Sequence, residues 1–424
     1  MEPLKLTIPE PQCRPGDNPD FSEVAIPPAG AAPRPALDAP AESMHDLAFT
    51  LIRVLDDEGH AVGPWAESPE STAGVDPTTG TEKLSLSFDQ LREGLEHMLT
   101  LRALDHRMLL AQRQQKTSFY MPHLGEEAVS CAFRRALREG DMNFPTYRQA
   151  GLLIAGGYPL LSMMNQVYAN AGDPTHGRQL PVLYSAKDHG FFSISGNLAT
   201  QIPQAVGWAM ASAIAGDTKI AVAWIGDGST AEGDFHAGLV FASTYQPPVV
   251  LNVVNNQWAI STFQGIPRGR SRTLAHRGLG YGIPSLRVDG NDYLAVYAAG
   301  RWAADRARAG HGPTLIEHVT YRAGGHSTSD DPSAYRPAGE SEAWPLGDPI
   351  QRLKQHLIVS GEWSEEQHAE LIAKVTEHVI ETQQQAETIG TLHHGSRSSR
   401  KFMFDGVFED LPPHLERQRE EAGF

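Results

Sequence analysis

The chain has 424 residues, of which 40% are hydrophobic and 20% are charged, and its formal net charge is −16. This length allows one large domain with additions or two to three smaller domains, and the apolar share excludes a wholly disordered chain. The excess of 51 Asp and Glu over 35 Lys and Arg argues against a nucleic-acid partner, which requires clustered cations.

Membrane and secretory classes are also disfavoured. No apolar run approaches the roughly 18 to 20 residues of a membrane-spanning helix, so no membrane partner is expected. The N-terminus lacks the basic start and apolar stretch of a secretory signal. Cys13 and Cys131 lie far apart in the sequence, and two cysteines support neither a disulfide framework nor a zinc site made of thiols. The expected compartment is a reducing cytoplasm.

Residues 1–86 are expected to form a proline-rich irregular arm with one short β-hairpin. Ten of the 30 prolines fall within the first 40 positions, where they remove backbone donors. The run 47–63 is rich in β-forming residues and contains an Asp-Asp-Glu-Gly turn, which predicts the hairpin. A long amphipathic helix is then predicted from its N-cap, Ser87, to about Gln114, because Leu and Met recur at three- and four-residue steps.

Short apolar runs alternate with helical stretches from about residue 180 to residue 322. Strands are predicted at 219–225, 248–254, 283–289 and 313–321, and helices at 198–215 and 292–309. Strands that are apolar on both faces and separated by helices are typical of a parallel sheet covered on both sides. The expected fold class is therefore α/β, with a doubly wound, mostly parallel sheet flanked by helices.

The chain beyond Gly347 has a helical pattern again. Ser364 and Gln367 predict a capping box, and the helix that it opens should run to about Gly390 before a polar tail. Three regions are therefore expected, namely the arm of residues 1–86, an α/β domain of residues 87–346 with its leading helix, and a helical region of residues 347–424.

The sequence GDGSTAEGDF places Asp227 between two glycines directly after a predicted strand. Ligands of open parallel sheets bind at the carboxyl ends of the strands, and Gly226 and Gly228 allow the backbone to approach a ligand closely. Ser229 and Glu232 predict a second capping box, so that a helix begins at once and its free N–H groups face the same place. A phosphate suits this helix end, but the carboxylate would repel it unless a cation lies between them. Mg²⁺ is the expected cation.

The end of the next strand supplies a second group for this cation. Asn255 and Asn256 follow an apolar run, and Asn256 lies 29 residues beyond Asp227. The Asp-Gly pair alone is more often an ordinary turn, and Asn255 alone is expected to be structural. The combination of both motifs at adjacent strand ends favours cofactor binding.

These motifs, GDG followed by NN, resemble the diphosphate-binding motif of thiamine-diphosphate enzymes. The stretch GDGSTAEGDFHAGLVFASTYQPPVVLNVVNNQWAIST is similar to the α subunit of 2-oxo acid dehydrogenase E1 components, and the resemblance extends from about residue 85 to 420. It is strongest for the branched-chain (2-oxoisovalerate) enzyme, through the runs KTSFYMPHLGEEA, GRQLP, LATQIPQAVG, SLRVDGND and TYRAGGHSTSDDPSAYR. The resemblance implies the thiamine-diphosphate-binding fold of the diphosphate-binding type.

The resemblance also implies a site for thiamine diphosphate and Mg²⁺. Its metal ligands would be Asp227, the side chain of Asn256 and the backbone carbonyl of Trp258. The residues expected to contact the cofactor are Tyr147, Arg148, Leu198, Gly226, Asp227, Gly228, Ser229, Thr230, Asn256 and His326. His326 is also the expected catalytic residue, because an unperturbed imidazole titrates near pH ~6.5 and could donate or accept a proton during acyl transfer.

Two further sites are implied less directly. Phe119 and Gly196 are candidates for the acyl pocket, although an aromatic residue after a long helix usually belongs to the core. The family's potassium-binding turn corresponds to a segment whose middle differs from the mitochondrial pattern, and its candidate ligands are Ser195, Asn197, Thr200 and Gln201.

Other departures from the mitochondrial proteins concern the phosphate clamp and phosphorylation. Val254 and Thr146 replace an arginine and a glutamine near the cofactor, which leaves the construction of the clamp open. Ser327 matches a serine that is phosphorylated in those relatives, whereas Pro337 replaces a second one. Kinase control of this chain is therefore left open.

The implied function is oxidative decarboxylation of a branched-chain 2-oxo acid, with transfer of the acyl group to lipoamide on an E2 acyltransferase. The cofactor would carry the difficult chemistry. In this family a separate β subunit supplies the carboxylate that activates the cofactor, so an α2β2 heterotetramer is expected and the chain alone should be inactive.

Three alternatives remain open at this point. A pyruvate dehydrogenase α subunit would share the same diphosphate site. A non-catalytic scaffold could retain the fold without the cofactor. A Mg²⁺-dependent phosphatase would need a second aspartate two residues after Asp227, where the chain has Ser229.

Overall fold

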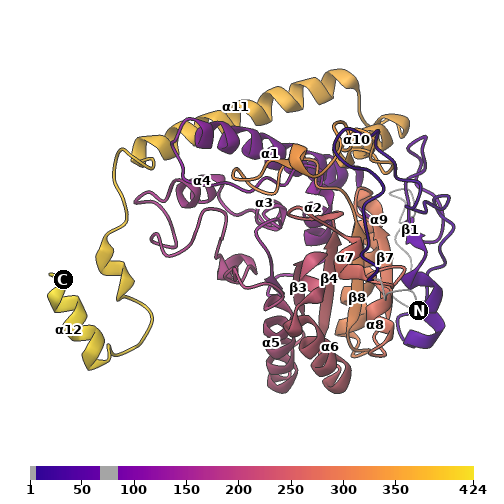
Figure 1. The fold of residues 1–424 in the computed structure, drawn as a ribbon, viewed down its shortest axis with the longest axis horizontal. Helices are drawn as coiled ribbons and strands as arrows, with labels where there is room; N and C mark the ends of the chain where they lie inside the picture. Colours follow the sequence, from indigo (N-terminus) through magenta and orange to yellow (C-terminus); the bar gives the residue numbers. More distant parts are fainter. Residues whose placement is uncertain (1–5, 67–84) are drawn as a thin grey trace.

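The computed structural model describes residues 6–66 and 85–424, and its centre is a six-stranded sheet (Figure 1). Neighbouring strands are parallel throughout, and their order is β1-β7-β8-β4-β3-β2. The strands of this sheet are β1 (Leu51–Ile52), β2 (Met142–Phe144), β3 (Ala221–Gly226), β4 (Val249–Asn255), β7 (Ser285–Asp289) and β8 (Thr314–Val319). A separate antiparallel hairpin follows β4 and consists of β5 (Trp258–Ala259) and β6 (Thr262–Phe263).

Helices cover the sheet and extend beyond it. The α-helices are α1 (Phe88–Arg113), α2 (Glu127–Arg135), α3 (Gly151–Ala155), α4 (Leu160–Tyr168), α5 (Gln201–Ala215), α6 (Gly233–Tyr245), α7 (Gly265–Arg268), α8 (His276–Leu279), α9 (Tyr293–Arg308), α10 (Pro349–Val359), α11 (Glu365–Ile389) and α12 (Pro413–Glu421). The 3₁₀-helices are η1 (Ala41–Ala48), η2 (Lys187–His189), η3 (Gly228–Ala231), η4 (Pro332–Ala334) and η5 (Arg400–Met403). None of the helices in the described ranges is long and apolar enough to cross a bilayer.

Successive side chains of the central strand β3 pack into two different cores. On one face, Ala223 and Ile225 of β3 pack with buried residues of α5 and α6. On the other face, Val222 and Trp224 pack with buried residues of α9, α2 and α1. Figure 1 shows α5 and α6 together at one end of the molecule, and α1 beside α11 at the other. This two-sided covering confirms the predicted doubly wound parallel α/β fold.

The predicted helix ends agree with the observed caps. The Ser87 side chain accepts a hydrogen bond from the Gln90 N–H at 3.2 Å, and the Gln90 side chain accepts one from the Ser87 N–H at 2.9 Å. Ser364 precedes α11 and accepts a hydrogen bond from the Gln367 N–H at 3.2 Å, which is one of the two bonds of the predicted capping box. Each cap satisfies a backbone donor that the first helical turn leaves free.

The hairpin predicted at 47–63 is only partly correct. Leu55 and Ala61 form one antiparallel bridge around a turn, but β1 pairs in parallel with β7 at the edge of the central sheet. Leu51 and Ile52 are both fully buried at the sheet edge. A solvent-facing hairpin would leave part of this apolar surface in water. The arm therefore contributes one strand to the domain that follows it. Its residues 1–5 and 67–84 lie outside the described ranges, and the predicted boundaries at 86 and 346 stay predictions.

The rest of the described arm lies along the surface of the α/β domain. The Trp302 indole donates a hydrogen bond to the carbonyl oxygen of Pro35 at 3.0 Å, and Arg306 donates to that of Ala39 at 3.0 Å. Phe21 packs edge-on against Trp344, with ring centroids 5.1 Å apart. Side chains of α9 therefore donate the hydrogen bonds that these backbone carbonyl oxygens of the arm need.

Candidate active site

A cavity of about 570 Å³ opens at the carboxyl ends of β3 and β4. Gly226 pairs with Val254 at the last register position, and the Asp227 N–H donates to the Val254 carbonyl at 3.1 Å. The residues after both strands therefore meet at one edge of the sheet, as the parallel topology requires. The predicted site residues that line the cavity are Tyr147, Arg148, Ser195, Gly196, Leu198, Gln201, Gly226, Asp227, Gly228, Ser229, Asn256, Trp258 and His326.

Four predicted site residues do not line this cavity, namely Phe119, Asn197, Thr200 and Thr230. Thr230 is buried behind the turn, where its Oγ1 donates to the carbonyl oxygen of Asp227 at 2.7 Å. Thr200 donates through Oγ1 to the carbonyl oxygen of Asn197 at 2.9 Å, within the loop before α5. Phe119 is half-buried and packs against the main core, as its position after a long helix makes usual.

The predicted capping box of Ser229 and Glu232 is wrong. The chain first forms the 3₁₀ turn η3, in which the Asp227 side chain accepts a hydrogen bond from the Gly228 N–H. The helix α6 begins only at Gly233, and Glu232 precedes it without a side-chain capping bond. Asp227 takes the capping position itself, and Ser229 lines the cavity instead. A Cβ on Gly228 would lie 2.6 Å from the Ala259 Cβ, so glycine is needed for the β5 hairpin to approach.

Asp227 is a buried carboxylate with one unused oxygen. Its Oδ1 accepts the Gly228 N–H at 2.7 Å, while Oδ2 has no hydrogen-bond partner among the described residues. Burial raises the pKa of Asp227 to about 7; the Gly228 bond opposes that rise and nearby Glu126 adds to it. An uncompensated buried carboxylate is costly, and a bound cation would offset this cost.

Asn256 and Trp258 line the same cavity as Asp227 and carry further oxygen atoms. The Asn256 amide Nδ2 donates to Glu126 Oε1 at 2.7 Å, and the Trp258 carbonyl accepts from Arg322 Nη1 at 3.1 Å. Across residues 6–66 and 85–424, no cluster of three or more His, Cys, Asp or Glu side chains could hold a metal. A carboxylate, an amide and a carbonyl fit Mg²⁺, which shares its remaining coordination positions between phosphate and water.

Arg148 and His326 lie together among the residues that line the cavity. Arg148 is 4% exposed, and its guanidinium donates to the carbonyl oxygens of Pro122 and His326. Its Nη2 also lies 3.1 Å from His326 Nδ1, and the Tyr147 ring packs edge-on against the imidazole at 5.6 Å. Because Nδ1 faces a guanidinium donor, the ring proton belongs on Nε2.

The surroundings of His326 differ from those of an unperturbed imidazole, whose pKa is about 6.5, and its catalytic role stays a prediction. Burial, together with the positive charges of Arg148 and Arg322, lowers the pKa of His326 to about 3. The imidazole is therefore neutral at physiological pH and can donate through Nε2–H. An anionic ligand in the cavity would raise this pKa again.

Glu126 lines the cavity, although the sequence analysis did not select it. It belongs to the run KTSFYMPHLGEEA, at the start of α2, where two consecutive glutamates are typical of an ordinary helix N-terminus. The fold separates their roles, because Glu126 faces Asn256 while Glu127 accepts a hydrogen bond from Arg102 Nε at 2.8 Å. No sequence pattern distinguishes the two.

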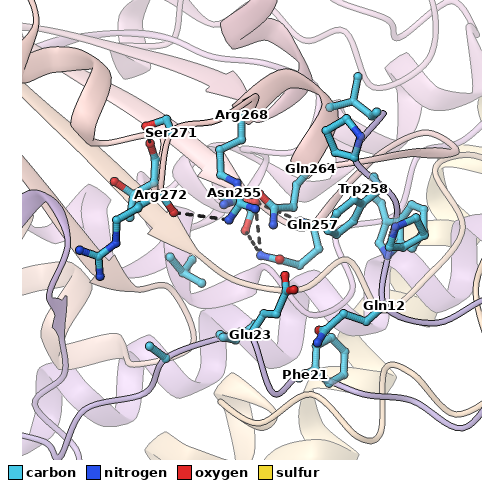
Figure 2. A pocket seen from close by; sticks show the side chains of 18 of the residues that line it. Gln12, Phe21, Glu23, Asn255, Gln257, Trp258, Gln264, Arg268, Ser271 and Arg272 are labelled. Carbon is cyan, nitrogen blue, oxygen red and sulfur yellow. Dashed lines mark hydrogen bonds between the residues drawn. The ribbon is translucent and has the colours of Figure 1, made fainter. Parts of the chain in front are cut away.

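A second cavity, of about 710 Å³, lies on the other side of the end of β4 (Figure 2). Asn255 and Gln257 border it, together with Glu23 of the N-terminal arm, whereas Asn256 faces the first cavity. Asn255 donates to Glu317 Oε1 at 2.8 Å and accepts from Gln257 Nε2 at 3.3 Å. The two consecutive asparagines therefore serve different cavities.

The site can be compared with known proteins. The family model described as "Dehydrogenase E1 component" matches residues 95–394. The chain belongs to the dehydrogenase E1 component family. A second model, described as "2-oxoisovalerate dehydrogenase E1 alpha subunit N terminal", matches residues 2–42 of this E1 family member. The family that the GDG and NN motifs resemble is thereby confirmed.

Relatives of this E1 family member carry a consistent name. It is 58% identical over 422 residues to the 2-oxoisovalerate dehydrogenase subunit alpha of Pseudomonas aeruginosa, which covers 100% of the chain and 99% of that relative. The mitochondrial subunit alpha of Mus musculus is 40% identical over 371 residues, or 87% of the chain and 79% of the relative. The mitochondrial subunit alpha 1 of Arabidopsis thaliana is 38% identical over 367 residues, or 86% and 73%.

Proposed function

We propose that this chain is the α subunit of the E1 component of a branched-chain 2-oxo acid dehydrogenase complex. Such an enzyme decarboxylates a 2-oxo acid oxidatively and passes the acyl group to lipoamide on an E2 acyltransferase. The observation that carries the proposal is the buried Oδ2 of Asp227, which has no hydrogen-bond partner in the described part of the chain and lies at a cavity to which the adjacent strand end contributes Asn256. Full-length similarity to a 2-oxoisovalerate dehydrogenase subunit alpha favours a branched-chain substrate over pyruvate.

The cavity suits thiamine diphosphate bound through Mg²⁺. Asp227, Asn256 and the Trp258 carbonyl would hold the cation, and the backbone at Gly228 and Ser229 would approach the diphosphate. When bound, thiamine diphosphate supplies the electron sink for decarboxylation. Leu198 would support the cofactor, and the neutral His326 would hold a proton at Nε2 for exchange with the reacting group.

Exposed apolar residues at the cavity support the proposal of a protein partner. Leu198, Ile260 and Ile266 line the cavity and are 53%, 52% and 44% exposed, so they present apolar surface to solvent in the isolated chain. A β subunit that covered this surface would exclude water and supply the activating carboxylate. We therefore include the β subunit, in an α2β2 heterotetramer, and the lipoyl-bearing E2 in the proposal.

A potassium site and a cytoplasmic location complete the proposal. Gln201 is the first residue of α5, and its Nε2 donates to the Ser195 carbonyl oxygen at 3.1 Å. Its Oε1 is buried without a hydrogen-bond partner among the described residues, so it is a free acceptor for K⁺. Asn197 and Thr200 would contribute through the loop that contains Ser195. Cys13 and Cys131 are both free and buried, which fits a reducing compartment.

The decisive experiment compares the chain alone with the chain co-purified with its β subunit. Carbon dioxide release from 3-methyl-2-oxobutanoate should require both polypeptides, thiamine diphosphate and Mg²⁺, and should exceed release from pyruvate. Turnover by the lone chain would refute the two-subunit proposal. A preference for pyruvate would favour the acetyl-transferring alternative, and absence of cofactor binding in the assembled protein would favour a scaffold.

A further inference from the structure

Glu126 makes a contact inside the cavity that none of the predicted ligand roles includes. Its side chain is 3% exposed, and its Oε1 accepts the hydrogen bond from Asn256 Nδ2 at 2.7 Å. The Arg148 Nε lies 3.7 Å from the same oxygen, so one carboxylate adjoins both the amide and the guanidinium. Glu126 is the N-cap residue of α2, so its backbone is held at the end of a helix that packs against α9.

The contact decides which end of the Asn256 amide faces the cavity. An asparagine side chain has a donating NH₂ group and an accepting oxygen on opposite sides, and a carboxylate can only accept. When Glu126 takes the NH₂ group, Oδ1 must turn away from it. Among the described residues, that oxygen has only one long hydrogen bond, from the Trp258 N–H at 3.3 Å. An amide in the opposite orientation would present a donor to a cation.

We propose that Glu126 is a positioning residue, which fixes the Asn256 amide so that its oxygen, rather than its NH₂ group, is available to the cation. The inference rests on the proposed function, because it assumes a cation at Asp227. Glu126 itself accepts from protein donors and does not contact the cation. Loss of such orienting partners in metal sites typically weakens metal binding by about 10- to 100-fold.

The test uses the assembled α and β subunits, freed of metal and cofactor by chelation. Mg²⁺ is titrated at fixed thiamine diphosphate, and binding is followed by intrinsic tryptophan fluorescence, independently of turnover. E126A should raise the Mg²⁺ concentration for half-saturation by about 10- to 100-fold. E126Q should recover most of this loss, because a glutamine oxygen can still accept from Asn256.

Two comparisons separate positioning from damage to the fold. The neighbouring E127Q is the matched control, since Glu127 is equally buried but contacts Arg102 outside the cavity. It should leave Mg²⁺ binding within a few-fold of the parent while size-exclusion elution shows that the assembly persists. In the N256A background, E126A should add little, because the group that it positions is already absent.

The outcomes distinguish this inference from the proposed function. If D227A leaves Mg²⁺ binding unchanged, the cation site itself is wrong. If D227A and N256A weaken Mg²⁺ binding but E126A behaves like the parent, the positioning role is wrong. Fully additive effects of E126A and N256A would also overturn it, because they would show that Glu126 acts independently of the amide.

Discussion

Arg148 donates a hydrogen bond from Nη2 to the backbone carbonyl oxygen of His326 at 2.7 Å, although 178 positions separate the two residues. This bond joins the predicted phosphate-binding arginine to the loop that contains the predicted catalytic histidine. The same guanidinium also donates to the backbone carbonyl oxygen of Pro122, so Arg148 holds two loops against the cavity.

R148K should therefore weaken thiamine diphosphate binding and loosen the His326 loop together. Lysine retains the charge but lacks the planar fork, and loss of a charge-assisted hydrogen bond of about 1.5–3 kcal/mol corresponds to about 10- to 100-fold in affinity. Fluorescence titration would measure the affinity, and hydrogen exchange over residues 323–331 the loop. R102K serves as control, and loosening of that loop in R102K but not in R148K would contradict the prediction.

Asn255 and Asn256 are adjacent, and replacing each of them with alanine gives a matched pair of variants. N256A should raise the Mg²⁺ requirement at least 10-fold because it removes a proposed ligand. N255A should leave that requirement unchanged and instead lower the free energy of unfolding by about 1–3 kcal/mol, because Glu317 loses a buried hydrogen-bond partner. Mg²⁺ titration and urea unfolding would be run on both. A stronger Mg²⁺ defect in N255A would show that the two roles are reversed.

Close packing between α5 and α6 depends on Gly238. A Cβ at this position would lie 2.4 Å from Cγ2 of Ile202, so G238A should lower the free energy of unfolding by about 1–3 kcal/mol. Gly207 also lies on α5, and a Cβ at this position would have no atom within 4 Å. G207A should therefore leave the free energy of unfolding unchanged or raise it. Urea unfolding of the purified chain measures both. The prediction fails if I202A does not relieve part of the cost of G238A.

His318 should make the stability of the chain depend on pH. It is fully buried between Trp224 and Phe133, and burial lowers its pKa to about 3. The ordinary pKa of an imidazole is about 6.5, so above that pH the ring is neutral in both the folded and the unfolded chain. As pH falls below 6.5, only the unfolded chain takes up the proton, and the free energy of unfolding decreases. Between pH 7 and pH 5 this group should account for about 2 kcal/mol of that loss.

The measurement is the free energy of unfolding in urea at pH 7 and pH 5. H318Q can still donate to Asn252, which accepts from the imidazole at 2.9 Å, and it should show a smaller decrease over this range. Equal decreases in the parent chain and H318Q would mean that other groups carry the pH dependence.

Much of the sheet could be predicted because its strands obey a local rule. The runs 219–225 and 248–254 are apolar on both faces and lie beside helical stretches, and the observed β3 and β4 fall within one or two residues of them. The three-residue β2 and two-residue β1 are too short to carry a pattern. Their positions depend on an available sheet edge, which is a property of the assembled fold.

By itself, the sequence determined the doubly wound fold, the meeting of Asp227 with Asn256 and the family, because strand periodicity and motif spacing are local properties. Only the tertiary structure decided that Glu126 faces the cavity while Glu127 does not, and that Asn255 and Asn256 serve different cavities. It also decided that Thr230 supports the turn from behind and that Ser229 does not cap a helix. Adjacent residues of one chemical type differ only in the direction of their side chains, and packing against distant segments sets that direction.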